Sequence, residues 1–190
     1  MSTITTYKGL YIDPLQPDES LIDIQDIAHA LSLLCRGNGH VRFFYSVAQH
    51  SLACAKEAKQ RGYDQRIQLG CLLHDASEAY LADVPRPLKR QWDVYNDVEK
   101  QLQMIIFDKY IQPTLTKDEI EKICKIDDDM LAYEFHQLMP HDISLDYHHI
   151  QSSVCITYQN MKKIEDEFVF YFMQCFDNQY HCSNNSLSKS

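Results

Sequence analysis

The chain has 190 residues, a formal net charge of −9 and a hydrophobic fraction of 45%. This length fits one domain with a sizeable core. The acidic balance argues against general nucleic-acid binding, which usually needs a basic surface. No apolar run approaches the roughly 18 residues that a membrane-spanning helix requires. We therefore expect a soluble protein that binds neither nucleic acids nor membranes.

Cysteine usage points to a reducing compartment. The seven cysteines are scattered through the chain and form no CxxC pair. Their odd number, their spread and the lack of an N-terminal signal peptide predict reduced thiols in a cytoplasmic protein. Most of them fall on apolar stripes, and we interpret these as core residues rather than metal ligands.

The five glycines all lie at or before Gly70, which leaves too few turn residues for a β-sandwich or barrel and favours an all-α fold. Residues 1–20 read as an extended N-terminal segment that can form a small hairpin around Gly9. Residues 21–177 are expected to form a helical domain. Residues 178–190 are rich in Ser and Asn, and we expect a disordered tail there.

Helical periodicity and capping signals divide the domain. Ser46-Val47-Ala48-Gln49 and Thr116-Lys117-Asp118-Glu119 are capping boxes, so helices should begin at Val47 and Lys117. Asp64 can cap a helix that continues through His74 and Glu78. The other expected helices cover residues 24–35, 92–110 and 158–176.

Ionisable side chains interrupt several of these apolar stripes. In a helix, His74 and Glu78 would be i,i+4 neighbours, and Asp75 and Glu78 would be i,i+3 neighbours. A buried polar cluster of this kind is costly unless something compensates it, and a divalent cation would do so.

Two other helices offer further ligands. His50 lies in the first turn of one helix, and Asp127 shares a face with Ile123 and Leu131 on another. Asp128 is the alternative fourth ligand, whereas Asp129 is expected to face solvent. Each feature alone is ordinary, and the prediction depends on their occurring together on apolar helices. Two imidazoles and two carboxylates suit Mn, Co, Mg, Zn or Fe better than calcium.

The order His50, His74-Asp75 and Asp127 resembles the HD-domain metal-dependent phosphohydrolases. The similarity extends to Arg36-Gly37-Asn38-Gly39-His40, to the residues between Tyr45 and His50, to those between His74 and Glu78, and to those between Asp83 and Lys89. It covers roughly residues 8–138 and points to the branch with bacterial 5′-deoxynucleotidases and small phage deoxynucleoside triphosphate triphosphohydrolases. The three consecutive aspartates at 127–129 depart from the single aspartate of the family.

This resemblance implies an all-α bundle with a metal held between helices and hydrolysis of a nucleotide phosphate. Glu78 is the expected general acid/base, and Asp83 is expected to assist it. Arg36 and Lys89 are candidate phosphate-binding cations, and His40 is a candidate nucleotide contact that could equally hold its own loop. Arg86 reads as a surface base.

The nucleotide substrate remains open between monophosphates, which would release phosphate, and deoxynucleoside triphosphates, which would release tripolyphosphate. A phosphodiesterase of a cyclic or oligonucleotide signal and a non-catalytic nucleotide sensor are alternatives. Apolar residues on both sides of the helices at 92–110 and 158–176 lead us to expect a homo-oligomer.

Overall fold

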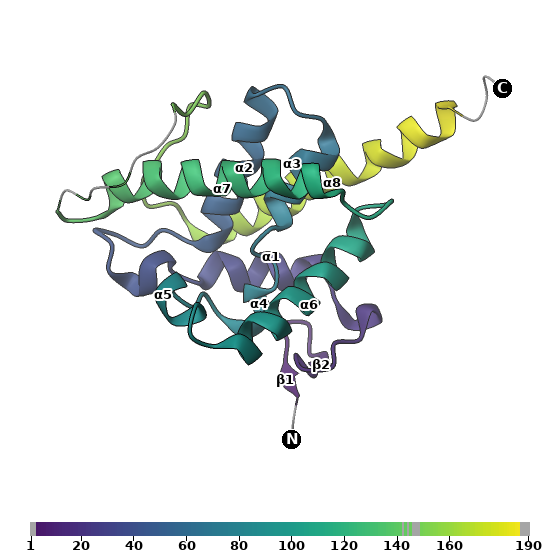
Figure 1. The fold of residues 1–190 in the computed structure, drawn as a ribbon, viewed down its shortest axis with the longest axis horizontal. Coiled ribbons are helices and arrows are strands. Elements are labelled where there is room, and N and C mark those ends of the chain that lie inside the picture. The colour runs from purple at the N-terminus through teal and green to yellow at the C-terminus, as the bar shows by residue number, and fades with distance from the viewer. Residues whose placement is uncertain (1–2, 142, 144, 146–148, 187–190) are drawn as a thin grey trace.

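The computed structural model describes residues 3–141, 143, 145 and 149–186 (Figure 1). The described chain is mostly helical, which agrees with the expected all-α class. Its elements, in chain order, are β1 (Ile4–Thr5), β2 (Tyr11–Ile12), the 3-10 helix η1 (Glu19–Leu21), α1 (Ile24–Leu33), the 3-10 helix η2 (Arg36–Gly39), α2 (Val47–Gln60), α3 (Gln65–Leu73), α4 (Glu78–Leu81), α5 (Arg86–Lys89), α6 (Asp93–Tyr110), α7 (Lys117–Leu138) and α8 (Met161–Ser186).

The N-terminal segment forms the small hairpin that the sequence suggested. Strands β1 and β2 are antiparallel, with Ile4 opposite Ile12. Gly9 turns the chain between them with a φ of 81°, a left-handed conformation that glycine adopts without steric cost. The backbone N–H of Lys8 donates to the Asp26 carboxylate at 2.7 Å and so ties the hairpin to α1.

Both capping boxes form as predicted. The Ser46 hydroxyl accepts from the N–H of Gln49, while the Gln49 side chain accepts from the N–H of Ser46. Thr116 and Glu119 make the same reciprocal pair at the start of α7. These bonds satisfy N–H groups that have no partner within the helix, and they fix where α2 and α7 begin.

The core lies where α2, α3, α7 and α8 meet. Helix α2 packs on α3 and α7, α3 packs on α7 and α8, and α1 packs on α8. Figure 1 shows α7 crossing α2 and α3. Leu72, Ile126 and Phe168 are fully buried at this junction. Burying each such side chain contributes about 1.5–3 kcal/mol to folding.

One predicted helix is broken. The sequence pattern suggested a continuous helix through His74 and Glu78, but α3 ends at Leu73 and α4 begins at Glu78. The intervening turn is held by i,i+3 bonds, from the N–H of Ala76 to Leu73 O and from the N–H of Glu78 to Asp75 O, both at 3.0 Å. The prediction was therefore wrong about this turn, which is wound more tightly than an α-helix.

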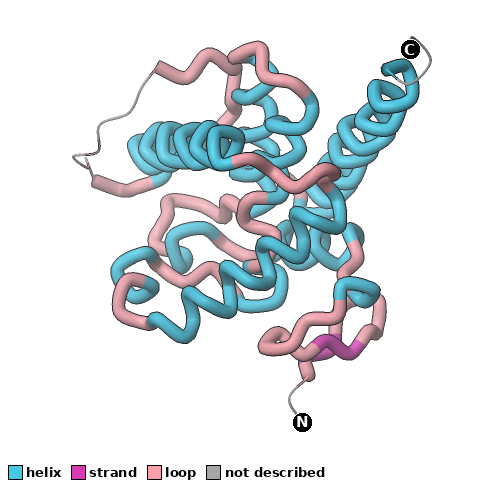
Figure 2. Tube along the Cα trace, turned by 45° about the vertical axis from the view of Figure 1, so that its right-hand side comes forward, coloured by secondary structure: helices cyan, strands magenta, loops and turns pink. Residues whose placement is uncertain are grey.

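The expected disordered tail also differs from the structure. Helix α8 continues through residues 178–186, and its C-terminal end extends away from the other helices (Figures 1 and 2). Lengthening an existing helix adds one backbone hydrogen bond per residue without a new nucleation cost, which favours continuation even in a polar sequence. Residues 187–190 lie outside the described part of the chain.

The described helices give no candidate for a membrane crossing, since none of them combines sufficient length with sufficient apolar character.

Gly70 allows close contact between α3 and α7. A Cβ atom at this position would collide with Ile123 Cδ1 and lie 3.2 Å from Ile123 Cγ1. We expect Gly70→Ala to lower the free energy of unfolding by about 1 kcal/mol, because overpacking costs more than the gain in helix propensity. Urea denaturation of the variant measures this loss.

Ile123→Val removes the Cδ1 atom and is the matched partner for this test. The loss in Gly70→Ala/Ile123→Val should be smaller than the sum of the two single losses. A Gly70→Ala variant as stable as the wild type would contradict the close packing.

Candidate metal centre

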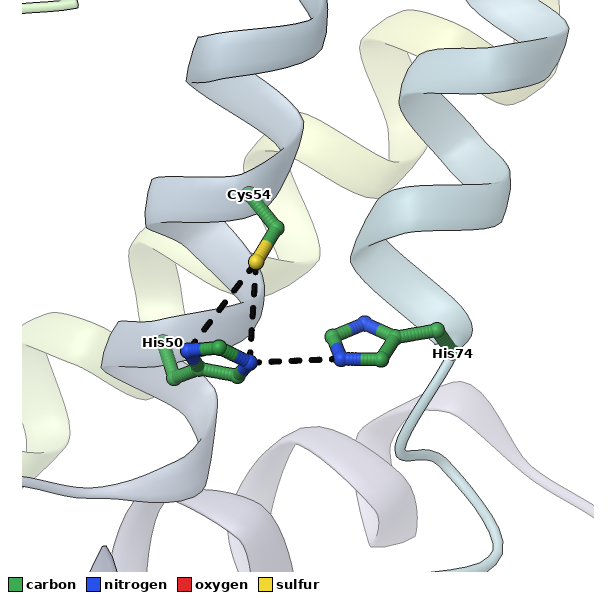
Figure 3. A group of neighbouring side chains, drawn as sticks. All are labelled: His50, Cys54 and His74. Carbon is green, nitrogen blue, oxygen red and sulfur yellow. Dashed lines mark hydrogen bonds between the residues drawn. The ribbon is translucent and has the colours of Figure 1, made fainter. Parts of the chain in front are cut away.

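Two histidines face each other between α2 and the end of α3. His50 lies in the first turn of α2, and His74 follows the last residue of α3. Their Nε2 atoms are 3.3 Å apart, and Figure 3 shows the two rings pointing at each other from different helices. The histidines that the sequence singled out therefore meet.

The Nδ1 partners determine which nitrogen of each ring is free. His74 Nδ1 lies 2.7 Å from the carbonyl oxygen of Cys71, which can only accept, so this nitrogen carries the proton. His50 Nδ1 lies 2.8 Å from the buried carboxylate of Glu134, which favours the same tautomer. When both rings are neutral, their Nε2 atoms present lone pairs toward the same point.

Two carboxylates converge on this point. Asp127 Oδ1 lies 3.0 Å from His50 Nε2 and 3.5 Å from His74 Nε2. Asp75 Oδ2 lies 3.3 Å from His74 Nε2 and 3.9 Å from His50 Nε2. Four groups that prefer to accept therefore surround one small volume, and they repel one another unless a cation or protons lie between them.

The spacing of these four atoms fits a divalent metal. Ligands bound at about 2.1 Å in tetrahedral or octahedral geometry are about 3.0–3.4 Å apart. Four of the five measured separations, at 3.3, 3.0, 3.5 and 3.3 Å, lie within that interval or just above it, and the fifth, from His50 Nε2 to Asp75 Oδ2, is larger at 3.9 Å. His50, His74, Asp75 and Asp127 could together hold a first-row divalent cation.

Cys54 is a neighbour that the sequence did not suggest as a ligand. His50, Cys54 and His74 form a group that could bind a metal ion, with all ligand atoms within 4.8 Å of one another (Figure 3). Cys54 Sγ lies 3.6 Å from His50 Nε2. Burial and the negative charges of Asp127 and Glu134 raise the pKa of Cys54 well above its usual value. Because the thiolate is the metal-binding form, the carboxylates are the better candidates.

Charge interactions reinforce the cluster. Burial alone would lower the pKa of His74, but Asp75 and Asp127 raise it well above the usual value. Burial alone would raise the pKa of Asp127, but the hydrogen bonds to His50 and His74 hold this pKa well below its usual value. Both shifts show that these carboxylates stabilise positive charge at this point.

The three consecutive aspartates have different surroundings. Asp127 points to the histidines, which favours it as the fourth ligand, whereas the Asp128 side chain is 61% exposed and pairs with Arg86. Asp129 was expected to face solvent, and this prediction was wrong. It is buried, and it pairs with Arg61 at 3.1 Å and with Lys125.

A cavity of about 360 Å³ opens beside the histidine–aspartate cluster. It brings together most of the predicted site residues, which come from η2, the turn after α3, the segment around α5, and α7. The predicted residues that line it are Arg36, Asp75, Glu78, Asp83, Lys89 and Asp127. His40 is exposed at the end of η2 and is not among the described residues that line the cavity.

Glu78 occupies an unusual place in this cavity. Its side chain is 5% exposed, and its Oε2 atom is buried without a hydrogen-bond partner among the described residues. Burial, followed by the charges of Asp75 and Asp83, raises the pKa of Glu78 well above its usual value, although Lys89 and Arg36 oppose this. A carboxylic acid that keeps its proton at neutral pH can act as a general acid.

Sequence reasoning missed two parts of the site. Glu134 accepts from Tyr45 Oη at 2.9 Å as well as from His50 Nδ1, so it orients a candidate ligand. Its position seven residues after Asp127 was the available signal. Arg86 was interpreted as a surface base, but it lines the cavity and lies 2.8 Å from Asp127.

Comparison with known proteins identifies relatives without a stated activity. No family model matches the sequence. The chain is 38% identical over 123 residues to the uncharacterized protein YfdR of Escherichia coli, a match that covers 64% of this chain and 65% of YfdR. It is 32% identical over 129 residues to the uncharacterized protein RCAP_rcc00048 of Rhodobacter capsulatus, covering 65% of this chain and 66% of that protein. The matches thus span slightly less than two thirds of each relative.

The raised pKa of Glu78 predicts a pH-dependent stability. Above the ordinary pKa of a glutamate, the unfolded chain loses this proton freely, whereas the folded chain loses it only at a cost. The protein should therefore lose stability as pH rises, by at most about 1.4 kcal/mol per pH unit from this group. Glu78→Gln removes the cost, so its advantage over the wild type should grow between pH 5 and pH 8.

Urea denaturation in EDTA measures this difference. Glu121→Gln is a suitable control, because the side chain of Glu121 is 67% exposed. The control should show no pH-dependent advantage. A constant difference between Glu78→Gln and the wild type across this pH range would contradict the buried, protonated state.

The neighbouring aspartates make a matched pair for metal binding. Asp127→Asn should weaken the binding of Mn²⁺ or Co²⁺ by more than about tenfold, because it removes a charged ligand. Asp128→Asn should leave it nearly unchanged, since the Asp128 side chain is 61% exposed and pairs with Arg86. Isothermal titration calorimetry distinguishes the two variants, and equal losses would refute the choice of Asp127.

Proposed function

We propose that this protein is a metal-dependent phosphohydrolase of the HD-domain type that acts on nucleotide phosphates. The observation that carries the proposal is the cluster of His50, His74, Asp75 and Asp127 beside a cavity that also contains Glu78. Four converging acceptors supply a divalent cation site, and the adjacent carboxyl group supplies a proton-transfer group.

The charge balance of the cavity supports a phosphate substrate only together with a cation. With Glu78 protonated, the charged side chains among the described lining residues are the three carboxylates Asp75, Asp83 and Asp127 and the three cations Arg36, Arg86 and Lys89. These charges cancel, so the side chains alone offer no net positive charge to a phosphate. A divalent metal held by His50, His74, Asp75 and Asp127 would add that positive charge and would supply Lewis-acid activation of a phosphate and of water.

The residues of the chain then have distinct roles. Glu78 carries the proton that the leaving oxygen needs, because its buried environment keeps the carboxyl group protonated. Asp83 assists by its negative charge, which helps to raise the pKa of Glu78. Glu134 keeps the His50 ring oriented through the 2.8 Å bond to Nδ1.

Two basic residues of the cavity can stabilise the negative charge of a bound phosphate. Arg36 is nearly buried, and its guanidinium lies 3.4 Å from Asp75 and 3.9 Å from Glu134. Its Nε atom is buried without a hydrogen-bond partner among the described residues, so it retains a donor. Lys89 Nζ lies 3.4 Å from Glu78 and also pairs with Glu99. Both cations can stabilise a phosphate as its charge develops.

Separate substitutions test metal binding and turnover. Asp75→Ala should abolish both bound metal and activity, since it removes a ligand. Glu78→Ala should retain the metal and lose at least about 100-fold in turnover, a typical contribution of general acid–base catalysis. Metal analysis and initial rates of nucleotide hydrolysis measure the two effects. A Glu78→Ala variant that hydrolyses nucleotides at the wild-type rate would disprove the assigned role.

Assaying a panel of nucleotides with Mn²⁺ or Co²⁺ identifies the substrate for these rate measurements. Release of phosphate from deoxynucleoside monophosphates identifies a nucleotidase, and release of tripolyphosphate identifies a triphosphohydrolase. Absence of any product across the panel would contradict the proposed function.

A further inference from the structure

Arg86 joins the wall of the cavity to the aspartate run of α7. Its Nη2 atom lies 2.8 Å from Asp127 Oδ2, and its Nη1 atom lies 2.8 Å from Asp128 Oδ1. The other oxygen of Asp127 faces His50 at 3.0 Å. The guanidinium therefore lies one carboxylate away from the centre of the candidate metal site.

The three cationic side chains of the cavity differ in how far they are exposed to solvent. Side-chain exposure is 8% for Arg36, 20% for Lys89 and 51% for Arg86. Arg36 is enclosed by Asp75 and Glu134, and Lys89 is held between Glu78 and Glu99. Arg86 is the one most accessible to a molecule that enters the cavity.

The chemistry of the side chain also suits an anion. A guanidinium has five N–H donors in a planar fork, and the bonds to Asp127 and Asp128 need only two of them. The remaining donors can bind a phosphate while the anchoring bonds stay in place. Planar, paired donors of this kind match the oxygens of a phosphate group.

We propose that Arg86 directly binds the phosphate group of the substrate and that Asp128 anchors it for this purpose. This inference rests on the proposed function and adds a substrate-binding residue to it. It also assigns different roles to the neighbouring residues Asp127 and Asp128. Asp127 faces the candidate metal site, while Asp128 holds the arginine from α5, 42 residues away in sequence.

The test compares Arg86→Ala, Arg86→Lys and Asp128→Asn with the wild type. Arg90→Ala is the matched control, because it removes the same charge from the end of the same short helix, where Arg90 is exposed. Three quantities are measured: KM and kcat for dAMP with Mn²⁺, the Kd of inorganic phosphate for the Mg²⁺-loaded protein, and the Kd of the metal alone.

For Arg86→Ala we expect KM and the phosphate Kd to rise by about tenfold or more, because a charge-assisted hydrogen bond is lost. The change in kcat should be smaller, and the metal Kd should stay within about threefold of the wild type. Arg86→Lys should restore part of the affinity, since it keeps the charge but loses the fork. Asp128→Asn should shift the phosphate Kd in the same direction by less, because Asp127 still holds Arg86. Arg90→Ala should behave like the wild type.

Two results would overturn the inference. The first is an Arg86→Ala variant with the KM and phosphate Kd of the wild type and of Arg90→Ala. The second is a metal Kd that rises in parallel with KM, which would make Arg86 a positioning residue for Asp127. Failure of the wild type to hydrolyse any nucleotide would instead count against the proposed function, and the phosphate titration would still decide the role of Arg86.

Discussion

The arrangement of the site depends on how the two histidines are oriented. The Cys71 carbonyl and the Glu134 carboxylate engage the Nδ1 atoms of His74 and His50, so that both Nε2 atoms present lone pairs to the same point. The Cys71 carbonyl is available because α3 ends at Leu73, and the last carbonyls of a helix have no partner within it. The break in the helix is thus a condition for the site and not a defect in the packing.

Local signals predicted the framework of the fold well. The capping boxes at Ser46 and Thr116 require only side chains three residues apart, so the sequence contains all the information that sets the start of α2 and α7. The turn after His74 could not be found in this way. Its residues, His74-Asp75-Ala76-Ser77, are compatible with a helix, and the tighter winding is determined by contacts with other elements, such as the Gln103 side chain that binds the N–H of Ser77.

The kinds of residues in the candidate site were predictable, but their partners were less so. Helical spacing placed Asp127 on an inward face, and the structure brings it to His50. The same reasoning placed Asp129 in solvent, because it considered only neighbours on its own helix. Arg61, the residue that follows α2, reaches across to Asp129, with its Nη2 atom 3.1 Å from Asp129 Oδ2. A buried carboxylate is tolerated when such a partner is present. The periodicity of a single helix does not predict which residues of other helices its side chains contact.

The two sides of the cavity are built differently. The part with the candidate metal site rests on the packed helices α2, α3 and α7, whereas another part of the wall includes α5, a four-residue helix with no buried residue. Substitutions in α5 would therefore remove little buried surface, and the cost to folding should be small. Chains with the same packed helices could therefore diverge in this part of the wall without losing the fold. The shape and charge of the cavity could thus change here one residue at a time.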